Sequence, residues 1–161
     1  MSGGTKIAIA TSRIALALAV VTTGLLVART ASAISPALEK ELQSAEYVYI
    51  SSTRKDGSLG EAAEIWFFYH QGAVYVGTKQ TTWRVRRIVA GRPDAKIWVG
   101  KRDGTSFAAT GELIDDDALE ALLMKTFAAK YPEGWKRYAE NFRKGFEDKS
   151  RVIVKYTAKA D

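Results

Sequence analysis

The residues of this chain that could do chemistry gather between positions 79 and 102. This window holds a single acid, Asp94, and eight cations: Lys79, Arg84, Arg86, Arg87, Arg92, Lys96, Lys101 and Arg102. On a helix expected over 81–89, Arg84 and Arg87 share a face and Arg86 points elsewhere. Hydroxyls, backbone N–H groups and cations, starting from Thr78 and Lys79, could converge on one phosphate. The alternative is a solvated basic face without a ligand.

Other reactive side chains are scarce. The chain has no cysteine, which excludes disulfides, thiolate metal sites and iron–sulfur clusters, and its single histidine, His70, argues against a histidine-based triad. His70 is expected at a strand end beside a turn, with proton donation or haem ligation as the alternatives. The acidic run Asp115–Asp117 is expected to cap a helix, so no metal site is predicted. No catalytic acid or base can be named, so a bound cofactor would have to supply any chemistry.

Length and charge set the limits of the fold. The 161 residues are enough for one domain with one hydrophobic core. Of the net charge of +6, residues 1–33 carry +3, and the 21 basic and 18 acidic residues of the remainder give another +3. Because the body is only mildly basic, nucleic acid is not an expected partner.

The first 33 residues have the pattern of a signal peptide. Lys6 and Arg13 precede an apolar run over 14–28, and Ala31 and Ala33 supply the small residues of a cleavage site. We expect cleavage after Ala33 and a periplasmic or extracellular location. An uncleaved membrane anchor is the less favoured alternative, because the apolar run is short for a membrane span.

Residues 34–161 are then expected to form one mainly β (α+β) domain. A short helix over 36–43 precedes strands over 47–53, 62–70 and 74–78, which form a meander. After the 81–89 helix, strands over 96–101 and 106–114 form a hairpin, two amphipathic helices follow, and a sixth strand spans 150–157. Six antiparallel strands with helices over the ends predict a compact barrel.

The strand over 62–70 carries consecutive aromatic residues. Alternation places Trp66 and Phe68 on one face of the sheet and Phe67 and Tyr69 on the other. One face fills the barrel, and the other needs a cover, because an exposed aromatic surface promotes association. A homodimer interface is the favoured cover, and the two C-terminal helices are the alternative.

The order of several segments resembles the pyridoxamine 5′-phosphate oxidase-like, flavin-binding split-barrel superfamily. The matching segments lie within residues 45–115, in this order: Tyr47–Gly57, Ile65–Phe68, Gly72–Thr78, Trp83–Ile88 and Pro93. The chain departs from the family pattern at Arg84, where lysine is frequent, and at Arg92, where asparagine usually precedes the proline. Arginine can still hold a phosphate through a bidentate contact.

The resemblance implies a six-stranded antiparallel split β-barrel, with a short helix beside the cofactor phosphate and a C-terminal helix pair. It also implies a homodimeric FMN-dependent oxidoreductase acting on a small molecule, with a deazaflavin coenzyme as the alternative cofactor. Phosphate binding is assigned to Thr78, Lys79, Arg84 and Arg87, and ring contacts to Trp66 and Phe67. A non-enzymatic exported barrel, with the cofactor lost or haem bound through His70, is the competing hypothesis.

Overall fold

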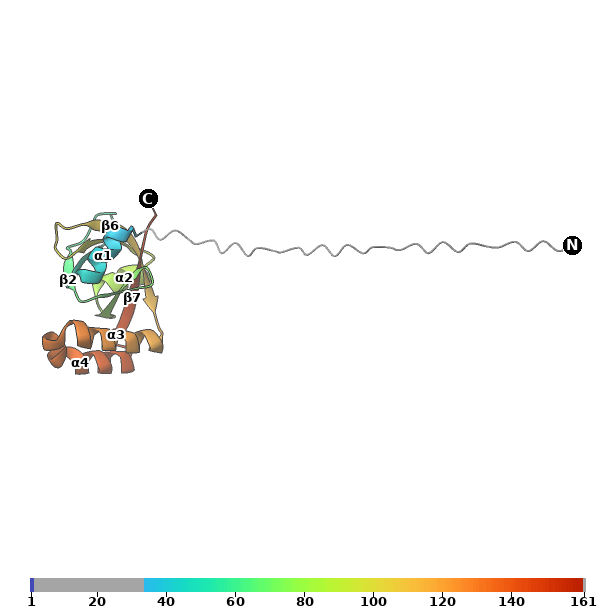
Figure 1. Cartoon of the computed structure of the whole chain (residues 1–161). Coiled ribbons are helices and arrows are strands. Elements are labelled where there is room, and N and C mark those ends of the chain that lie inside the picture. The colour runs from blue at the N-terminus through green and yellow to red at the C-terminus, as the bar shows by residue number, and fades with distance from the viewer. Residues whose placement is uncertain (2–33, 161) are drawn as a thin grey trace. The chain divides into compact units, whose positions relative to one another are not determined.

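The computed structural model describes Met1 and residues 34–160. Residues 34–160 form a curled antiparallel sheet with four helices (Figure 1). The strands follow the order β2-β1-β5-β6-β7-β4-β3, and their six pairings are all antiparallel. The strands are β1 (Val48–Ser52), β2 (Ala63–Ile65), β3 (Phe68–His70), β4 (Ala73–Lys79), β5 (Asp94–Val99), β6 (Ser106–Ile114) and β7 (Arg151–Ala158). The helices are α1 (Pro36–Ser44), α2 (Trp83–Val89), α3 (Asp117–Lys130) and α4 (Pro132–Glu147). The α+β class is therefore confirmed.

The predicted strand over 62–70 is two strands, so the described sheet has seven strands where six were expected. The chain leaves β2 at Ile65 and enters β3 at Phe68, and these strands pair with β1 and β4 at opposite ends of the strand order. Three residues span at most ~11 Å, so the two edges of the sheet must come close together. The sheet is therefore rolled up on itself, in line with the predicted barrel, and only the prediction of one continuous strand over 62–70 is wrong.

The alternation of the aromatic residues is confirmed by two separate cores. Phe67 is fully buried in the inner core with Tyr69 packed against it, whereas Phe68 and Trp66 belong to a second core under α3 and α4. Figure 1 shows these two helices side by side against one side of the sheet. The outer aromatic face is thus covered by the two C-terminal helices of the same chain, which was the alternative expectation. An exposed aromatic face therefore gives no reason to expect a dimer.

Helix boundaries follow the expected capping residues. The Ser35 Oγ accepts a hydrogen bond from the Leu38 N–H at 3.2 Å at the start of α1. The Asp116 carboxylate accepts one from the Leu119 N–H at 2.9 Å at the start of α3. The acidic run 115–117 therefore contains a helix cap, as predicted.

The strand switch at 66–67 is held by the end of α3. The buried Tyr131 hydroxyl accepts a hydrogen bond from the Phe67 N–H at 3.0 Å and donates one to the Glu46 carbonyl at 2.7 Å. Its ring stacks on Trp66 with centroids 4.5 Å apart. Lys130 donates to the Phe67 carbonyl at 3.2 Å, and burial lowers the pKa of its ammonium to about 8. Both backbone groups of Phe67 are thereby satisfied where the sheet ladder is interrupted.

Residues 2–33, which include the predicted signal segment, lie outside the described residues. Among the described helices, none has the length and apolar character needed to cross a bilayer.

Replacing Tyr131 with phenylalanine tests the role of this hydroxyl. The substitution keeps the ring stack and leaves the buried Phe67 N–H without a partner, which costs about 1–3 kcal/mol. We expect Tyr131→Phe to lower the free energy of unfolding by that amount in urea denaturation. The matched control is Tyr138→Phe, because Tyr138 is 42% exposed. This substitution should change the free energy of unfolding by less than about 0.5 kcal/mol. Equal effects of the two substitutions would contradict this role.

Candidate functional site

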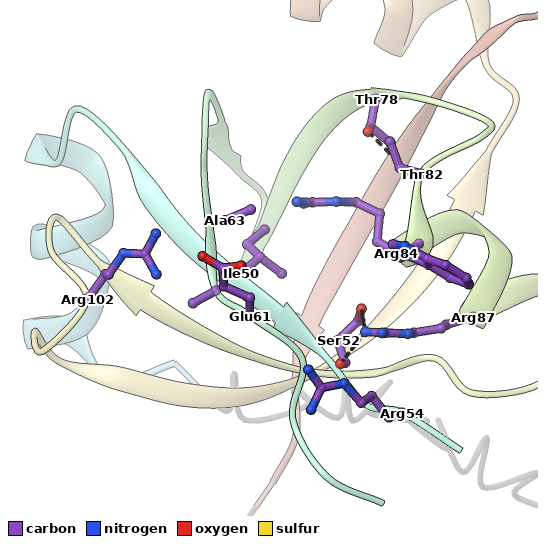
Figure 2. A pocket seen from close by; sticks show the side chains of 12 residues that line it. Ile50, Ser52, Arg54, Glu61, Ala63, Thr78, Thr82, Arg84, Arg87 and Arg102 are labelled. Carbon is purple, nitrogen blue, oxygen red and sulfur yellow. Dashed lines mark hydrogen bonds between the residues drawn. The ribbon is translucent and has the colours of Figure 1, made fainter. Parts of the chain in front are cut away.

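A cavity of about 800 Å³ lies between the β1–β2 edge of the sheet and the segment that joins β4 to α2 (Figure 2). Four arginines and one carboxylate line it, so its charge is strongly positive. The lining residues are Ile50, Ser52, Arg54, Glu61, Ala62, Ala63, Thr78, Thr82, Trp83, Arg84, Arg87 and Arg102. Such a volume is within the usual range of small-molecule sites.

Helix α2 presents Arg84 and Arg87 to this cavity, because the opposite face of the helix packs against the core. Val85 is buried in the inner core, and Ile88 packs against the same cluster. Arg84 and Arg87, which lie three residues apart on the helix, both line the cavity, while Arg86 is exposed and lies 5.3 Å from the centroid of the Trp83 ring. The predicted division of the three arginines between two faces is therefore confirmed.

Arg87 bridges α2 and β1. Its Nη1 donates to both the carbonyl and the hydroxyl of Ser52 at 2.7 Å. The guanidinium passes so close to Gly60 that a Cβ there would lie 2.7 Å from Nη1, and any side chain at this position would displace it. Figure 2 shows Arg87 directed at Ser52. Since these contacts already occupy it, Arg87 mainly holds the wall of the cavity together.

Arg84, in contrast to Arg87, keeps a donor without a hydrogen bond to any described residue. Its Nη1 is buried and has no hydrogen-bond partner among the described residues. The Tyr156 hydroxyl is likewise buried without such a partner. Burial raises the pKa of this hydroxyl, and the neighbouring Arg84 guanidinium opposes the rise. Figure 2 shows the Arg84 side chain extending into the cavity, below Thr78. A buried donor without a hydrogen bond is costly, and an anion bound at Nη1 would remove that cost.

Two threonine hydroxyls lie beside this cation. Thr78, at the end of β4, is 5% exposed, and its Oγ1 donates to the Thr82 Oγ1 at 3.3 Å. The Thr82 hydroxyl in turn donates to the Lys79 carbonyl at 2.9 Å. Arg84, Thr78 and Thr82 thus combine a charged donor with two hydroxyls, a set suited to a phosphate group.

The far side of the cavity carries residues that the sequence analysis did not assign to the cofactor. Arg102 follows β5, and its guanidinium carbon lies 5.4 Å from the centroid of the Tyr49 ring. Arg54 follows β1 and donates to the Leu59 carbonyl at 2.8 Å. Glu61 supplies the carboxylate of the lining. Arg102 belonged to the cationic window, but only the rolled sheet brings residues near 54, 61 and 102 to the side opposite Arg84.

Three of the residues assigned to the cofactor lie elsewhere. Lys79 follows Thr78, so alternation along β4 turns it away, and it lines a different cavity. Phe67 is fully buried in the inner core, and Trp66 is stacked on Tyr131 beneath α4. The structure therefore brings Thr78, Arg84 and Arg87 together, without Lys79, Trp66 or Phe67. The ring contacts assigned to Trp66 and Phe67 stay a prediction that the proposal below does not use.

His70 also lies apart from the cavity lining. It ends β3 before the Gln71–Gly72 turn, as expected, and is half-buried. Its ring centroid is 6.4 Å from that of Phe68 and 6.3 Å from that of Tyr75. Its environment is thus mainly aromatic and belongs to the helix-covered side of the sheet.

Comparison with solved structures identifies the fold. General stress protein 26 of Bacillus anthracis str. Sterne superposes with a TM-score of 0.55 at 17% identity, over 74% of this chain and 84% of that chain. A candidate pyridoxamine 5′-phosphate oxidase from Listeria innocua gives 0.54 at 13% identity, over 76% and 91%. The haem storage protein HutZ from Vibrio cholerae gives 0.55 at 12% identity, over 80% and 92%.

The chain therefore has the split-barrel fold of the pyridoxamine 5′-phosphate oxidase-like proteins, as its sequence resemblance predicted. No protein-family model matches the sequence, and a search of curated proteins finds no match. At these identities the likeness concerns the fold, and a function has to be argued from the cavity.

Substitution by methionine should distinguish the roles of the two cavity-lining arginines of α2 in the ligand-free protein. Arg84→Met removes a buried donor without a partner, so we expect the free energy of unfolding to stay equal or to rise, by up to about 1–3 kcal/mol. Arg87→Met breaks the bridge to Ser52, so we expect a loss of about 1–3 kcal/mol. Urea denaturation of both variants measures the contrast. A loss with Arg84→Met as large as that with Arg87→Met would contradict the assignment of Arg84 to ligand binding.

Proposed function

We propose that the chain binds FMN in the 800 Å³ cavity and acts as a flavin-dependent oxidoreductase on a small molecule. The unused Nη1 of Arg84 carries this proposal. A phosphate there would accept a hydrogen bond from a buried donor that has no partner among the described residues, and charge-assisted hydrogen bonds of this kind contribute about 1.5–3 kcal/mol. The Thr78 and Thr82 hydroxyls would bind the same group.

The rest of the lining suits the remainder of a flavin nucleotide. Trp83 is 67% exposed at the cavity and offers a ring face for stacking. Apolar side chains of β1 and β2, Ile50 and Ala63, line the cavity between Arg84 and Arg102 (Figure 2). A bound flavin supplies hydride or one-electron transfer, while the protein binds it, orients it and sets its electrostatic surroundings.

The fold is compatible with this function and also with others. The solved structures include a candidate pyridoxamine 5′-phosphate oxidase and a haem storage protein on the same scaffold. His70 does not line the cavity, so the described geometry favours a phosphate-bearing cofactor there over haem ligation by this residue. Our proposal keeps the homodimer and export as further properties. Cleavage after Ala33 would leave Ile34, which is 4% exposed within the inner core, as the first residue.

Titration with FMN and with riboflavin tests the assignment of the phosphate. The two ligands share the ring and differ in the phosphate, so we expect Arg84→Ala to weaken FMN binding about ten- to more than a hundredfold. The same substitution should leave riboflavin affinity within about twofold, since no phosphate contact is lost. Quenching of flavin fluorescence measures both dissociation constants.

Arg86→Ala is the matched control, because it removes an exposed arginine from the same helix. We expect it to bind FMN like the parent protein, since exposed charges contribute little. Equal FMN affinities for the parent, Arg84→Ala and Arg86→Ala would contradict the proposal. Absence of binding by the parent would favour the non-enzymatic barrel.

A further inference from the structure

A second cationic cavity, of about 400 Å³, lies where β4 ends and β7 begins, beside α4. Three cations, one carboxylate, an amide and a phenol line it. The residues are Lys79, Tyr138, Asn141, Lys144, Gly145, Asp148, Ser150 and Arg151. It shares no lining residue with the cavity of Arg84, because successive residues of β4, Thr78 and Lys79, face different cavities.

Arg151 forms the inner wall of this second cavity. Its Nη1 donates to the Gly77 carbonyl at 3.2 Å, and its guanidinium carbon lies 3.8 Å from the centroid of the Phe142 ring. Its Nε is buried and has no partner among the described residues. A Cβ at Gly145 would lie 2.8 Å from the Arg151 Cβ, so the glycine lets this side chain lie against α4. Burial lowers the pKa of the guanidinium.

Two lysines lie at the mouth of the cavity and leave its charge positive. Lys79 is exposed, and its ammonium has no ion pair among the described residues. Lys144 lies 3.6 Å from Glu140, which Arg143 also contacts at 2.7 Å. The carboxylate of Asp148 accepts a hydrogen bond from the Ser150 N–H at 2.9 Å. Lys79 is therefore available to an anion from solution, and Arg151 adds a half-buried positive charge to the inner wall.

An apolar cavity of about 300 Å³ adjoins the cationic one across Tyr138, which lines both. Its other lining residues are Ile65, Trp66, Phe142, Gly77 and Glu64. The Glu64 carboxylate is engaged by the Tyr49 hydroxyl. Arg151 lies at the boundary, since it contacts both Gly77 and Phe142. An apolar wall thus continues directly into a cationic one.

We propose that these adjoining cavities form a binding site for a small amphipathic anion. The apolar body of the ligand would lie against Trp66, Phe142 and Tyr138, and its carboxylate, sulfonate or phosphate would bind Lys79, Lys144 and Arg151. The anion would compensate the charge of the half-buried Arg151, and the aromatic rings would be withdrawn from water. The site is separate from the proposed flavin cavity and does not depend on it.

Paired fluorescent probes test this site on the full-length protein. 1-Anilinonaphthalene-8-sulfonate carries the anionic group, and N-phenyl-1-naphthylamine has the same rings without it. We expect the double variant Lys79→Gln/Lys144→Gln to weaken binding of the sulfonate about tenfold or more and to leave the neutral probe within about twofold. Both lysines are exposed, so the variant should keep the parent's melting temperature.

The matched control is Lys125→Gln/Lys136→Gln, which removes the same charge from exposed positions on α3 and α4 outside the two cavities. It should bind both probes like the parent, and so should Arg84→Ala. Similar losses in the two lysine variants, or no sulfonate binding by the parent, would overturn the proposal. Loss of sulfonate binding in Arg84→Ala alone would place the probe in the flavin cavity and would also overturn it, without affecting the FMN titration.

Discussion

The architecture depends on the closure of the sheet at Trp66 and Phe67. There the chain passes from β2, at one edge of the sheet, to β3, at the other, and for two residues it has no strand partner. Tyr131 and Lys130 supply the missing hydrogen bonds to the backbone of Phe67. The helix pair α3–α4 therefore does more than cover an aromatic face, because its central turn also fixes the point at which the sheet rolls up.

The arginine-lined cavity exists because of this closure. Its walls come from β1 and β2 on one side and from β4 and α2 on the other, which lie at opposite ends of the strand order. The hydrogen bonds from Arg87 to Ser52 then join the two walls directly. With Arg87 engaged in this bridge, Arg84 keeps a free, buried donor. Arg84 and Arg87 thus differ in role although they share a face of α2.

Local patterns in the sequence predicted much of this structure, and long-range geometry accounts for what they missed. The helix caps at Ser35 and in the acidic run 115–117 follow from residue type next to a helix start. The alternation of the aromatic residues over 66–69 and the different direction of Arg86 follow from strand and helix periodicity. The division of the 62–70 strand could not be predicted, because it depends on which distant strands pair with each half. Lys79 was grouped with Thr78 by proximity in sequence, although alternation along a strand separates them. Arg54, Glu61 and Arg102 line the same cavity only because the sheet is rolled up.

A crystal structure of the protein with bound FMN tests the central claim most directly. The account predicts the phosphate within hydrogen-bond distance of Arg84 Nη1 and of the Thr78 or Thr82 hydroxyl, with Arg87 still bound to Ser52. A phosphate that lies instead against Lys79 and Arg151, or a flavin that binds without contacting Arg84, would contradict it.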